Sequence, residues 1–299
     1  MKLYAPKYYE NFKCAADKCE HSCCIGWEID IDSESLSKYN EIRSEYGQEI
    51  KKSISTCGTP HFKLDKHERC PHLDKDGLCK IITELGEDFL CDICREHPRF
   101  YNFTDTAELG IGASCIEAAK IILSSKNYCE LTEIGDVDAE PYALDFDARG
   151  ERARVYEILS DSTKSYDERI ENIYKSFSIE KKSDGFWLEI LSSLEYLDEK
   201  HRALFLNYSD KRRKKGAEEY SERFLAYLIY RHVTEASDYE DFRLRLAFCL
   251  FCESLFSSLI YNEEKESLID AARLAVIISE EIEYSDENTE ALTYSLERF

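Results

Sequence analysis

Proline and glycine are scarce in this chain, which has 5 Pro and 11 Gly among its 299 residues. So few helix breakers argue against disordered or collagen-like structure, and the low glycine content argues against a barrel or sandwich rich in tight turns. Hydrophobic residues make up 43 % of the chain. This length and composition suffice to pack one large domain or two of ordinary size.

Positive charge is also in short supply. The chain has 39 Lys and Arg against 61 Asp and Glu, a formal net charge of −22. Proteins that bind nucleic acid or an anionic membrane surface are usually basic, so neither partner is expected. A cationic partner, such as a lysine-bearing protein segment, suits this surface better. The lone basic cluster, Lys211–Lys215, is expected to be a solvated loop or the start of a helix.

Long apolar segments are missing as well. The opening stretch MKLYAPKYYENFKC has no apolar core of signal-peptide length. The most apolar run, residues 244–261, contains Arg245 and Glu253 and is expected to be a buried helix that does not span a membrane. The sequence therefore favours a cytoplasmic protein. Disulfides are rare in that compartment, so the 13 cysteines need another explanation.

Cysteines gather in the first part of the chain, where all but Cys249 and Cys252 precede residue 130. Thiolates are soft, strong donors for zinc and iron, and a spacing such as Cys91-x2-Cys94 lets one loop give two sulfurs to one site. One four-ligand site that joins an early and a later group is natural, and the surplus allows a second site or cysteines that do not ligate. The candidate ligands are Cys14, Cys19, Cys23 and Cys24 in the early group, Cys70, Cys79, Cys91 and Cys94 in the later group, and the separate Cys115.

Spacing alone does not separate zinc from an iron–sulfur cluster. Structural zinc often uses two C-x2-C pairs, and only one, Cys91-x2-Cys94, occurs among the candidate ligands, whereas a cluster tolerates irregular spacing because its inorganic core sets the geometry. His21, His72 and His97 lie within the cysteine-bearing segments, and each is a ligand, a residue that orients a ligand, or an ordinary hydrogen-bonded loop histidine. Cys249 and Cys252, three residues apart in the apolar run, are expected to be inert core residues.

Hydrophobic spacing predicts helices through most of the chain. Residues 33–55 are predicted to form one helix capped by Asp32 or Ser33, residues 114–125 a second helix capped by Ser114, and residues 24–32 a short strand. Ser165 and Glu168 have the form of a capping box. Further helices are predicted after that box and at 186–197, 223–233, 238–261 and 266–282.

The sequence thus predicts a mostly α fold, in which a cysteine-rich, loop-rich, metal-organised N-terminal region packs on a C-terminal helical region. The predicted regions are 1–130, an acidic linker at 131–147, and 148–299. Strands and helices do not alternate, so a doubly wound sheet is not expected.

Four stretches resemble the bacterial flagellin lysine-N-methylase family, in order: FKCAADKCEHSCCIGWEIDID, CPHLDKDGLCKIITELGEDFLCDICREHPR, SCIEAAKIIL and YLIYRH. The resemblance covers most of the chain and is most specific before residue 125. Where the family tends to have Pro, this chain has Ile116, a difference that concerns the start of a helix. Seven of the cysteines also resemble a broader group of small zinc- or iron–sulfur-binding proteins: Cys14, Cys19, Cys23, Cys24, Cys70, Cys79 and Cys94.

The resemblance implies a protein-lysine N-methyltransferase that moves a methyl group from S-adenosylmethionine to lysine side chains of flagellin or of another lysine-bearing protein. It also implies an iron–sulfur cluster of the 4Fe–4S type held by the N-terminal cysteines, with zinc as the alternative. It does not imply any oligomeric state.

The residues themselves leave the cosubstrate site and the catalytic base open. ELGIGAS (108–114) is too short a glycine signal for a Rossmann-type methyltransferase, and the C-x3-C-x2-C pattern of radical enzymes fails because Gly26 stands at its third position. A lysine amine, with a pKa of about 10.4, must lose a proton before it accepts a methyl group. The candidates for a catalytic role are Tyr227, Tyr230 and Arg231, because they lie in the family-like motif YLIYRH. A non-enzymatic zinc-binding interaction module and an iron–sulfur redox protein remain alternative functions.

Overall fold

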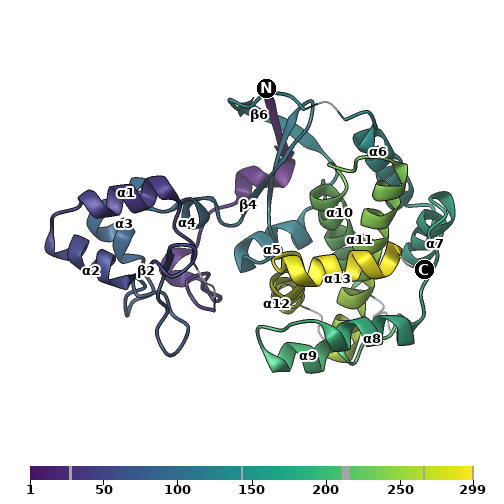
Figure 1. The fold of residues 1–299 in the computed structure, drawn as a ribbon. Helices are drawn as coiled ribbons and strands as arrows, with labels where there is room; N and C mark the ends of the chain where they lie inside the picture. The colour runs from purple at the N-terminus through teal and green to yellow at the C-terminus, as the bar shows by residue number, and fades with distance from the viewer. Residues whose placement is uncertain (27–28, 143, 211–215, 265–266, 298–299) are drawn as a thin grey trace. The chain divides into compact units, whose positions relative to one another are not determined.

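The computed structural model describes residues 1–26, 29–142, 144–210, 216–264 and 267–297. The chain divides into two compact units (Figure 1). Lys13–Pro98 form one, called here the cysteine unit; Met1–Phe12 and Arg99–Phe299 form the other, called the sheet–helix unit. These limits differ from the predicted regions 1–130 and 148–299, because the first strand of the chain pairs with strands that follow residue 99. The predicted basic cluster Lys211–Lys215 lies outside the described residues.

The cysteine unit consists of short helices and turns around one small core (Figure 1). Tyr39, Ile50 and Phe62 fill the centre of this core and are at most 1 % exposed. The elements of the unit are η2 (Ala16–Lys18), α1 (Ser33–Glu41), α2 (Glu45–Ser53), β2 (Ile54–Ser55), β3 (His61–Phe62), α3 (Lys80–Leu85), η3 (Glu87–Phe89) and α4 (Asp92–Glu96).

The predicted helix at 33–55 is in fact two helices, α1 and α2. Asp32 caps α1 by accepting a hydrogen bond from the Ser35 amide (2.8 Å), as predicted. Ser44 caps a new helix by accepting one from the Gly47 amide (3.1 Å), which the apolar spacing did not indicate. The predicted apolar face survives the break. All of its members belong to the core of the unit: Leu36, Tyr39, Ile42, Tyr46 and Ile50.

The predicted strand at 24–32 is wrong. Its described residues form only isolated bridges, from Ile25 to Arg69 and from Asp30 to His61, while residues 27 and 28 lie outside the described part. Gly26 has a φ of +84°, which interrupts extended backbone between the two bridges.

The sheet–helix unit contains a four-stranded sheet that was not predicted from the sequence. Its strands are β1 (Lys2–Pro6), β4 (Arg99–Phe103), β5 (Ala107–Ile111) and β6 (Leu131–Asp136), in the order β4-β5-β1-β6. Strand β1 runs parallel to β5 and antiparallel to β6, and β4 and β5 are antiparallel neighbours. The first part of the predicted linker 131–147 is therefore an edge strand. The fold is helical with a small mixed sheet.

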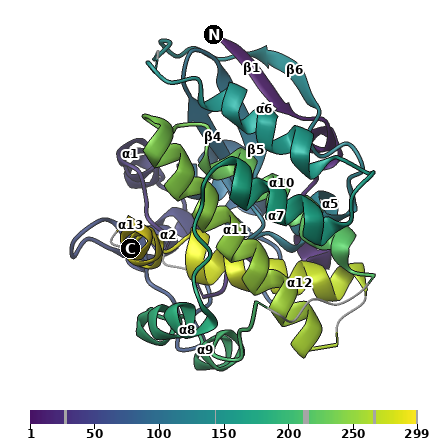
Figure 2. The same ribbon diagram turned by 90° about the vertical axis from the view of Figure 1, so that its right-hand side faces the viewer.

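Helices make up the rest of this unit (Figure 2). Helix α5 packs against α10 and α12, and α10 packs against α11. The capping box of Ser165 and Glu168 begins α7 as predicted. The elements are η1 (Lys7–Asn11), α5 (Ile116–Ser124), α6 (Ala148–Leu159), α7 (Tyr166–Ser176), α8 (Asp184–Ser193), α9 (Glu199–Phe205), α10 (Glu218–His232), α11 (Tyr239–Asn262), α12 (Leu268–Ile278), the π-helical turn η4 (Ser279–Glu283) and α13 (Asp286–Glu297).

Helix α11 is the predicted buried helix. Within the described ranges it is the one helix long and apolar enough to cross a membrane, but 83 % of that apolar window is buried inside the protein. Cys249 and Cys252 are fully buried in it, as expected for core residues. Burial raises the pKa of both thiols, so they stay protonated and inert.

A buried ion pair joins the sheet to the helices. Arg152 of α6 donates from both terminal nitrogens to the two oxygens of Glu108 on β5, at 2.6 Å each, and both side chains are at most 5 % exposed. The Arg152 guanidinium also lies 5.1 Å from the ring centroid of Tyr230 on α10. Such a bidentate, fully paired arrangement fixes β5, α6 and α10 in one geometry.

Candidate metal centre

Backbone pairing brings the early cysteine group to the later one. The Cys70 amide donates to the carbonyl of Cys24 at 2.8 Å, and the Gly26 amide donates to the carbonyl of Glu68 at 2.9 Å. Together with the Ile25–Arg69 bridge, these bonds hold Cys24 beside Cys70 across a sequence separation of 46 residues.

A tight loop after Cys70 then returns the chain to the neighbourhood of that residue. One oxygen of Asp74 accepts hydrogen bonds from the amides of Asp76 and Leu78, both at 2.8 Å. Cys79 forms a bridge with Leu73, and the Lys80 amide donates to the carbonyl of His72 at 2.7 Å. Aspartate turns of this kind fix loop geometry locally. The loop thereby places Cys79 on the same side of the core as Cys70.

Cys91 and Cys94 supply the third part of the assembly. The Cys94 amide donates to the Cys91 carbonyl at 3.0 Å, which places both side chains on one turn of α4. A hydrogen bond from the thiol of Cys94 lowers the pKa of Cys91 and raises that of Cys94. Cys91 is thus the sulfur of the pair that ionises first.

Five thiols consequently converge on the core of the cysteine unit, from separate segments of the chain. Cys70 is 7 % exposed and Cys91 is fully buried. Burial, with smaller contributions from the neighbouring sulfurs Cys24, Cys79 and Cys91, raises the pKa of Cys70 to about 12. The members of this set, called here the thiol cluster, are Cys24, Cys70, Cys79, Cys91 and Cys94.

Two members of the thiol cluster stand at helix N-termini. Cys79 is the N-cap of α3 and Cys91 is the N-cap of α4. Burial raises the pKa of Cys79, while hydrogen bonds from the amides of Ile82 and Ile81 oppose that rise. Amides at a helix start favour negative charge, so both positions suit a thiolate once a cation compensates the burial.

Cys24 is the member most easily ionised. A hydrogen bond from the Cys23 thiol, with smaller contributions from Ser22 and Arg69, lowers the pKa of Cys24 to about 7 against the effect of burial. Arg69 was not singled out from the sequence. Its contribution depends on the pairing of residues 24–26 with 68–70, which no local spacing encodes.

The other predicted ligands do not belong to the thiol cluster. Cys14 is exposed and its sulfur accepts a hydrogen bond from the Ala16 amide at 3.5 Å. Cys19 donates to the carbonyl of His21 at 2.9 Å, and Cys23 is exposed beside Cys24. Cys115 lies in the sheet–helix unit, where it is the N-cap of α5.

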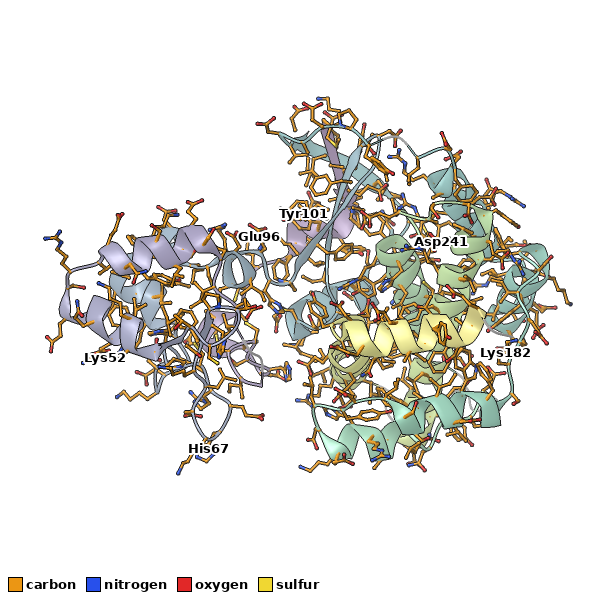
Figure 3. The ribbon with its side chains drawn as sticks, in the orientation of Figure 1. Lys52, His67, Glu96, Tyr101, Lys182 and Asp241 are labelled. Carbon is orange, nitrogen blue, oxygen red and sulfur yellow. The ribbon has the colours of Figure 1, made fainter. Side chains whose placement is uncertain are left out.

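His72 is a structural residue. Its Nδ1 lies 3.0 Å from the Tyr46 hydroxyl and its Nε2 lies 2.9 Å from Ser53 Oγ, so both ring nitrogens are already used. Burial lowers its pKa to about 4, which keeps the ring neutral. His67, in contrast, projects from the loop at 63–69, away from the core (Figure 3). His72, with both ring nitrogens hydrogen-bonded, is therefore not a free donor, and the residues of the core cluster include cysteines but no histidine.

The chemistry of this donor set fits a soft metal or an iron–sulfur core. Within the described ranges, no group of three or more His, Cys, Asp or Glu side chains is placed to hold a single ion directly. Thiols alone, without carboxylate or imidazole, match zinc and iron–sulfur centres and do not match calcium or magnesium.

The tyrosines of the YLIYRH motif are buried in α10. Tyr230 donates to the carbonyl of Leu109 at 3.2 Å and stacks under Arg152, a packing role. Tyr227 belongs to a polar network with Glu283 and Arg231. The stretch ELGIGAS joins strand β5 to helix α5, and Gly110 is required there because an added Cβ meets the ring of Phe100.

Comparison with known proteins gives matches in Salmonella. Two proteins described as lysine-N-methylase, from Salmonella choleraesuis and Salmonella typhimurium, are each 28 % identical to this chain over 138 residues. The matches cover 43 % of this chain and 34 % of each relative. Part of this chain is homologous to the flagellin lysine-N-methylase family. The Salmonella muenchen flagellar biosynthetic protein FliU is also 28 % identical over 138 residues, which cover 80 % of its length.

The homology to the lysine-N-methylases is partial. The matched part of this chain spans about a third of the length of the two lysine-N-methylases. No protein-family profile matches the chain, and no solved structure matches it. The expected likeness to this family is confirmed over that part of the chain, while the matches do not extend over most of the chain as expected.

Proposed function

We propose that this chain is a protein-lysine N-methyltransferase that transfers methyl groups from S-adenosylmethionine to lysine side chains of flagellin or of another lysine-bearing protein. The observation that carries the proposal is the partial homology to the Salmonella lysine-N-methylases. The flagellar name of the third relative supports flagellin as the substrate class. A net charge of −22 suits a partner that presents lysines.

The proposed chemistry is direct displacement at a sulfonium methyl group. The attacking amine must be neutral, and lysine in water has a pKa of about 10.4, so the enzyme has to accept a proton or desolvate the ammonium group. Nothing in the homology identifies the group that does so.

We propose that the thiol cluster holds a 4Fe–4S centre, with zinc as the alternative. Cys24, Cys70, Cys79, Cys91 and Cys94 are the thiols that the core of the cysteine unit brings together. Four suffice for either centre: the pair Cys91 and Cys94 gives two of them, and one of the other three sulfurs is then a neighbour. When bound, such a centre supplies positive charge that stabilises buried thiolates and cross-links the loops of the unit.

We propose a reducing, cytoplasmic place of action. Buried or half-buried thiols such as Cys24, Cys70, Cys91 and Cys94 lie close together without forming disulfides. Thiols arranged in this way persist where glutathione and thioredoxin keep them reduced.

The proposal is tested by incubating anaerobically purified full-length chain with S-adenosylmethionine carrying an isotopically labelled methyl group and with flagellin of the source bacterium. Labelled lysines, located by peptide mass spectrometry, are the expected result. S-adenosylhomocysteine, the product, is expected to suppress the labelling. No transfer to flagellin or to any protein of the bacterial lysate, together with no calorimetric binding of S-adenosylmethionine, would overturn the proposal and leave a metal-binding interaction module.

A further inference from the structure

Glu283 is a buried carboxylate with an unusual set of partners. It ends the π-helical turn η4, and its side chain is 0 % exposed. Tyr227 donates a hydrogen bond to the carboxylate, with its hydroxyl 3.1 and 3.0 Å from the two oxygens, and Arg231 Nε lies 3.4 Å from Oε1. His232 Nε2 lies 2.8 Å from the same Oε1. π-Helical turns inside helical segments occur frequently at functional sites.

Tyr227 is fully occupied in this network. Its hydroxyl oxygen accepts hydrogen bonds from the Ala113 amide at 3.0 Å and from Arg231 Nη1 at 3.1 Å, while its proton goes to Glu283. A phenol has one donor and two acceptor positions, and all three are used. Burial raises the pKa of Tyr227 well above its ordinary value. Tyr227 therefore positions Glu283 and has no capacity to accept a substrate proton.

His232 is the most exposed member of the network, ahead of Arg231, whose side chain is 13 % exposed. The side chain of His232 is 17 % exposed, and Nε2 is fixed on the buried carboxylate. No residue of the described part of the chain hydrogen-bonds to Nδ1. The ring packs edge-on against Phe248 of α11, with centroids 5.1 Å apart, which holds its orientation. Nε2 is thus anchored, and Nδ1 has no hydrogen-bond partner among the described residues.

The charges around the imidazole are balanced. Arg231 of α10 faces Glu283, and Arg245 of α11 is paired with Asp241 at 2.8 Å. Burial lowers the pKa of His232, and the two arginines add to this effect while Glu283 opposes it. Burial alone favours protonation of Glu283, but Arg231 and His232 lower its pKa to about 2. At neutral pH the pair is therefore an ionised carboxylate and a neutral imidazole.

A second Glu–His pair arises from the same π-helical turn and serves as an internal comparison. Glu281 lies 2.6 Å from His201 Nδ1, but its oxygens also accept the amides of Leu197 at 2.9 Å and Asp198 at 3.3 Å. These bonds fasten the start of α9 and account for Glu281 structurally. Glu283 accepts no backbone amide among the described residues. Its partners Tyr227, Arg231 and His232 are side chains of α10, and Ser279 of its own turn also lowers its pKa.

We propose that Nδ1 of His232 accepts the proton that the substrate lysine ammonium gives up, with Glu283 as the positioning residue; this proposal rests on the proposed methyl transfer. An N–H bond of the ammonium breaks as Nδ1–H forms. The freed electron pair attacks the sulfonium methyl carbon, and the carbon–sulfur bond breaks with its electrons moving to sulfur, which leaves S-adenosylhomocysteine. The imidazolium then returns its proton to water. Glu283 stabilises the imidazolium while it exists.

The test compares H232Q with H201N in the full-length chain. Gln places its amide nitrogen where Nε2 of His232 donates to Glu283, so the anchor remains and only the proton acceptor is lost. Asn likewise retains the Nδ1 position of His201. We expect H232Q to lose about 100-fold or more in kcat, the usual contribution of a general base, and H201N to lose less than about 3-fold.

The pH profile separates a proton acceptor from a structural residue. In the wild type, kcat is expected to fall tenfold per pH unit below an apparent pKa under 6.5, because only neutral imidazole accepts the proton. H232Q is expected to lose that limb, to become faster as pH rises toward the pKa of free lysine, and to regain activity with added imidazole. An unchanged profile and no rescue in a folded H232Q that still binds S-adenosylmethionine would contradict the proposal for His232 alone. A wild type without methyl transfer would instead remove the proposed function itself.

Nuclear magnetic resonance supplies a readout without turnover. In histidine-labelled wild-type protein, the nitrogen shifts are expected to show His232 with its proton on Nε2 and with Nδ1 unprotonated at pH 7. A proton on Nδ1 at that pH would contradict the proposal.

Discussion

At the scale of single residues, one carboxylate joins two helices of the cysteine unit. Asp32 Oδ1 accepts the Ser35 amide at the start of α1, and Asp32 Oδ2 accepts the Asp92 amide at the start of α4, at 2.9 Å. The first bond was predictable because an aspartate before an apolar-periodic segment is a usual N-cap. The second was not, since it spans 60 residues and depends on the folded core.

Replacement of Asp32 by Ala is expected to lower the free energy of unfolding of the cysteine unit by about 1–2 kcal/mol, the usual cost of a lost cap. Burial opposes ionisation of Asp32, but the amides of Ser35 and Asp92 lower its pKa to about 2. A depressed carboxyl pKa stabilises the fold above the unfolded value near 4 and stops doing so as pH falls toward 2. Amide hydrogen exchange in α1 and α4 measures this. D32A and wild type are expected to converge near pH 2, and Glu34→Ala, an exposed neighbour, is the control with little effect.

At the scale of elements, the helices were easier to predict than the strands. Period-3.6 spacing and caps located α7, α8, α10 and α11, since both signals are local. The sheet was not predicted because its strands are five or six residues long and β1 pairs with β5 across about a hundred residues. The break between α1 and α2 was not predicted because a serine such as Ser44 can also occupy the interior of a helix.

The α1–α2 turn provides the prediction at this scale. A Cβ added at Gly47 would contact the Ile42 side chain and lie 2.8 Å from the Ile42 carbonyl oxygen, which cannot move freely. G47A is therefore expected to destabilise the cysteine unit by roughly 1–3 kcal/mol. G185A in α8 is the matched control, because its nearest contact is 3.9 Å away, and it is expected to be neutral or slightly stabilising. Equal urea midpoints for G47A and wild type would show that the turn has room to adjust.

At the scale of the whole molecule, the distribution of cysteines anticipated the separate cysteine unit but not its limits. The early and later groups fall within Lys13–Pro98, while Met1–Phe12 belongs to the sheet. The limits depend on β1 pairing with β5 and β6, which the N-terminal sequence alone does not encode. Tertiary pairing also decides which of the predicted cysteines converge. The backbone hydrogen bond from the Cys70 amide to the Cys24 carbonyl is an example.

Loss of the proposed centre is expected to loosen one unit only. A chelator that strips the centre should increase amide hydrogen exchange throughout residues 13–98, because short helices such as α3 and α4 have few other constraints. Exchange in α10 and α11 should not change, since these helices are buried in their own core. Mass spectrometry of peptides resolves the two regions. An equal increase in exchange in both regions, or no increase in either, would contradict the assignment of the centre to the cysteine unit.

The most direct test measures iron, acid-labile sulfide and zinc in anaerobically purified wild type, C94A and C252A. The wild type is expected to contain one thiolate-bound centre per chain, C94A to have lost it, and C252A to retain it, since Cys252 is a buried core residue of α11. Wild-type protein without bound metal, or equal metal content in all three proteins, would contradict the claim that the converging thiols of the cysteine unit hold an inorganic centre.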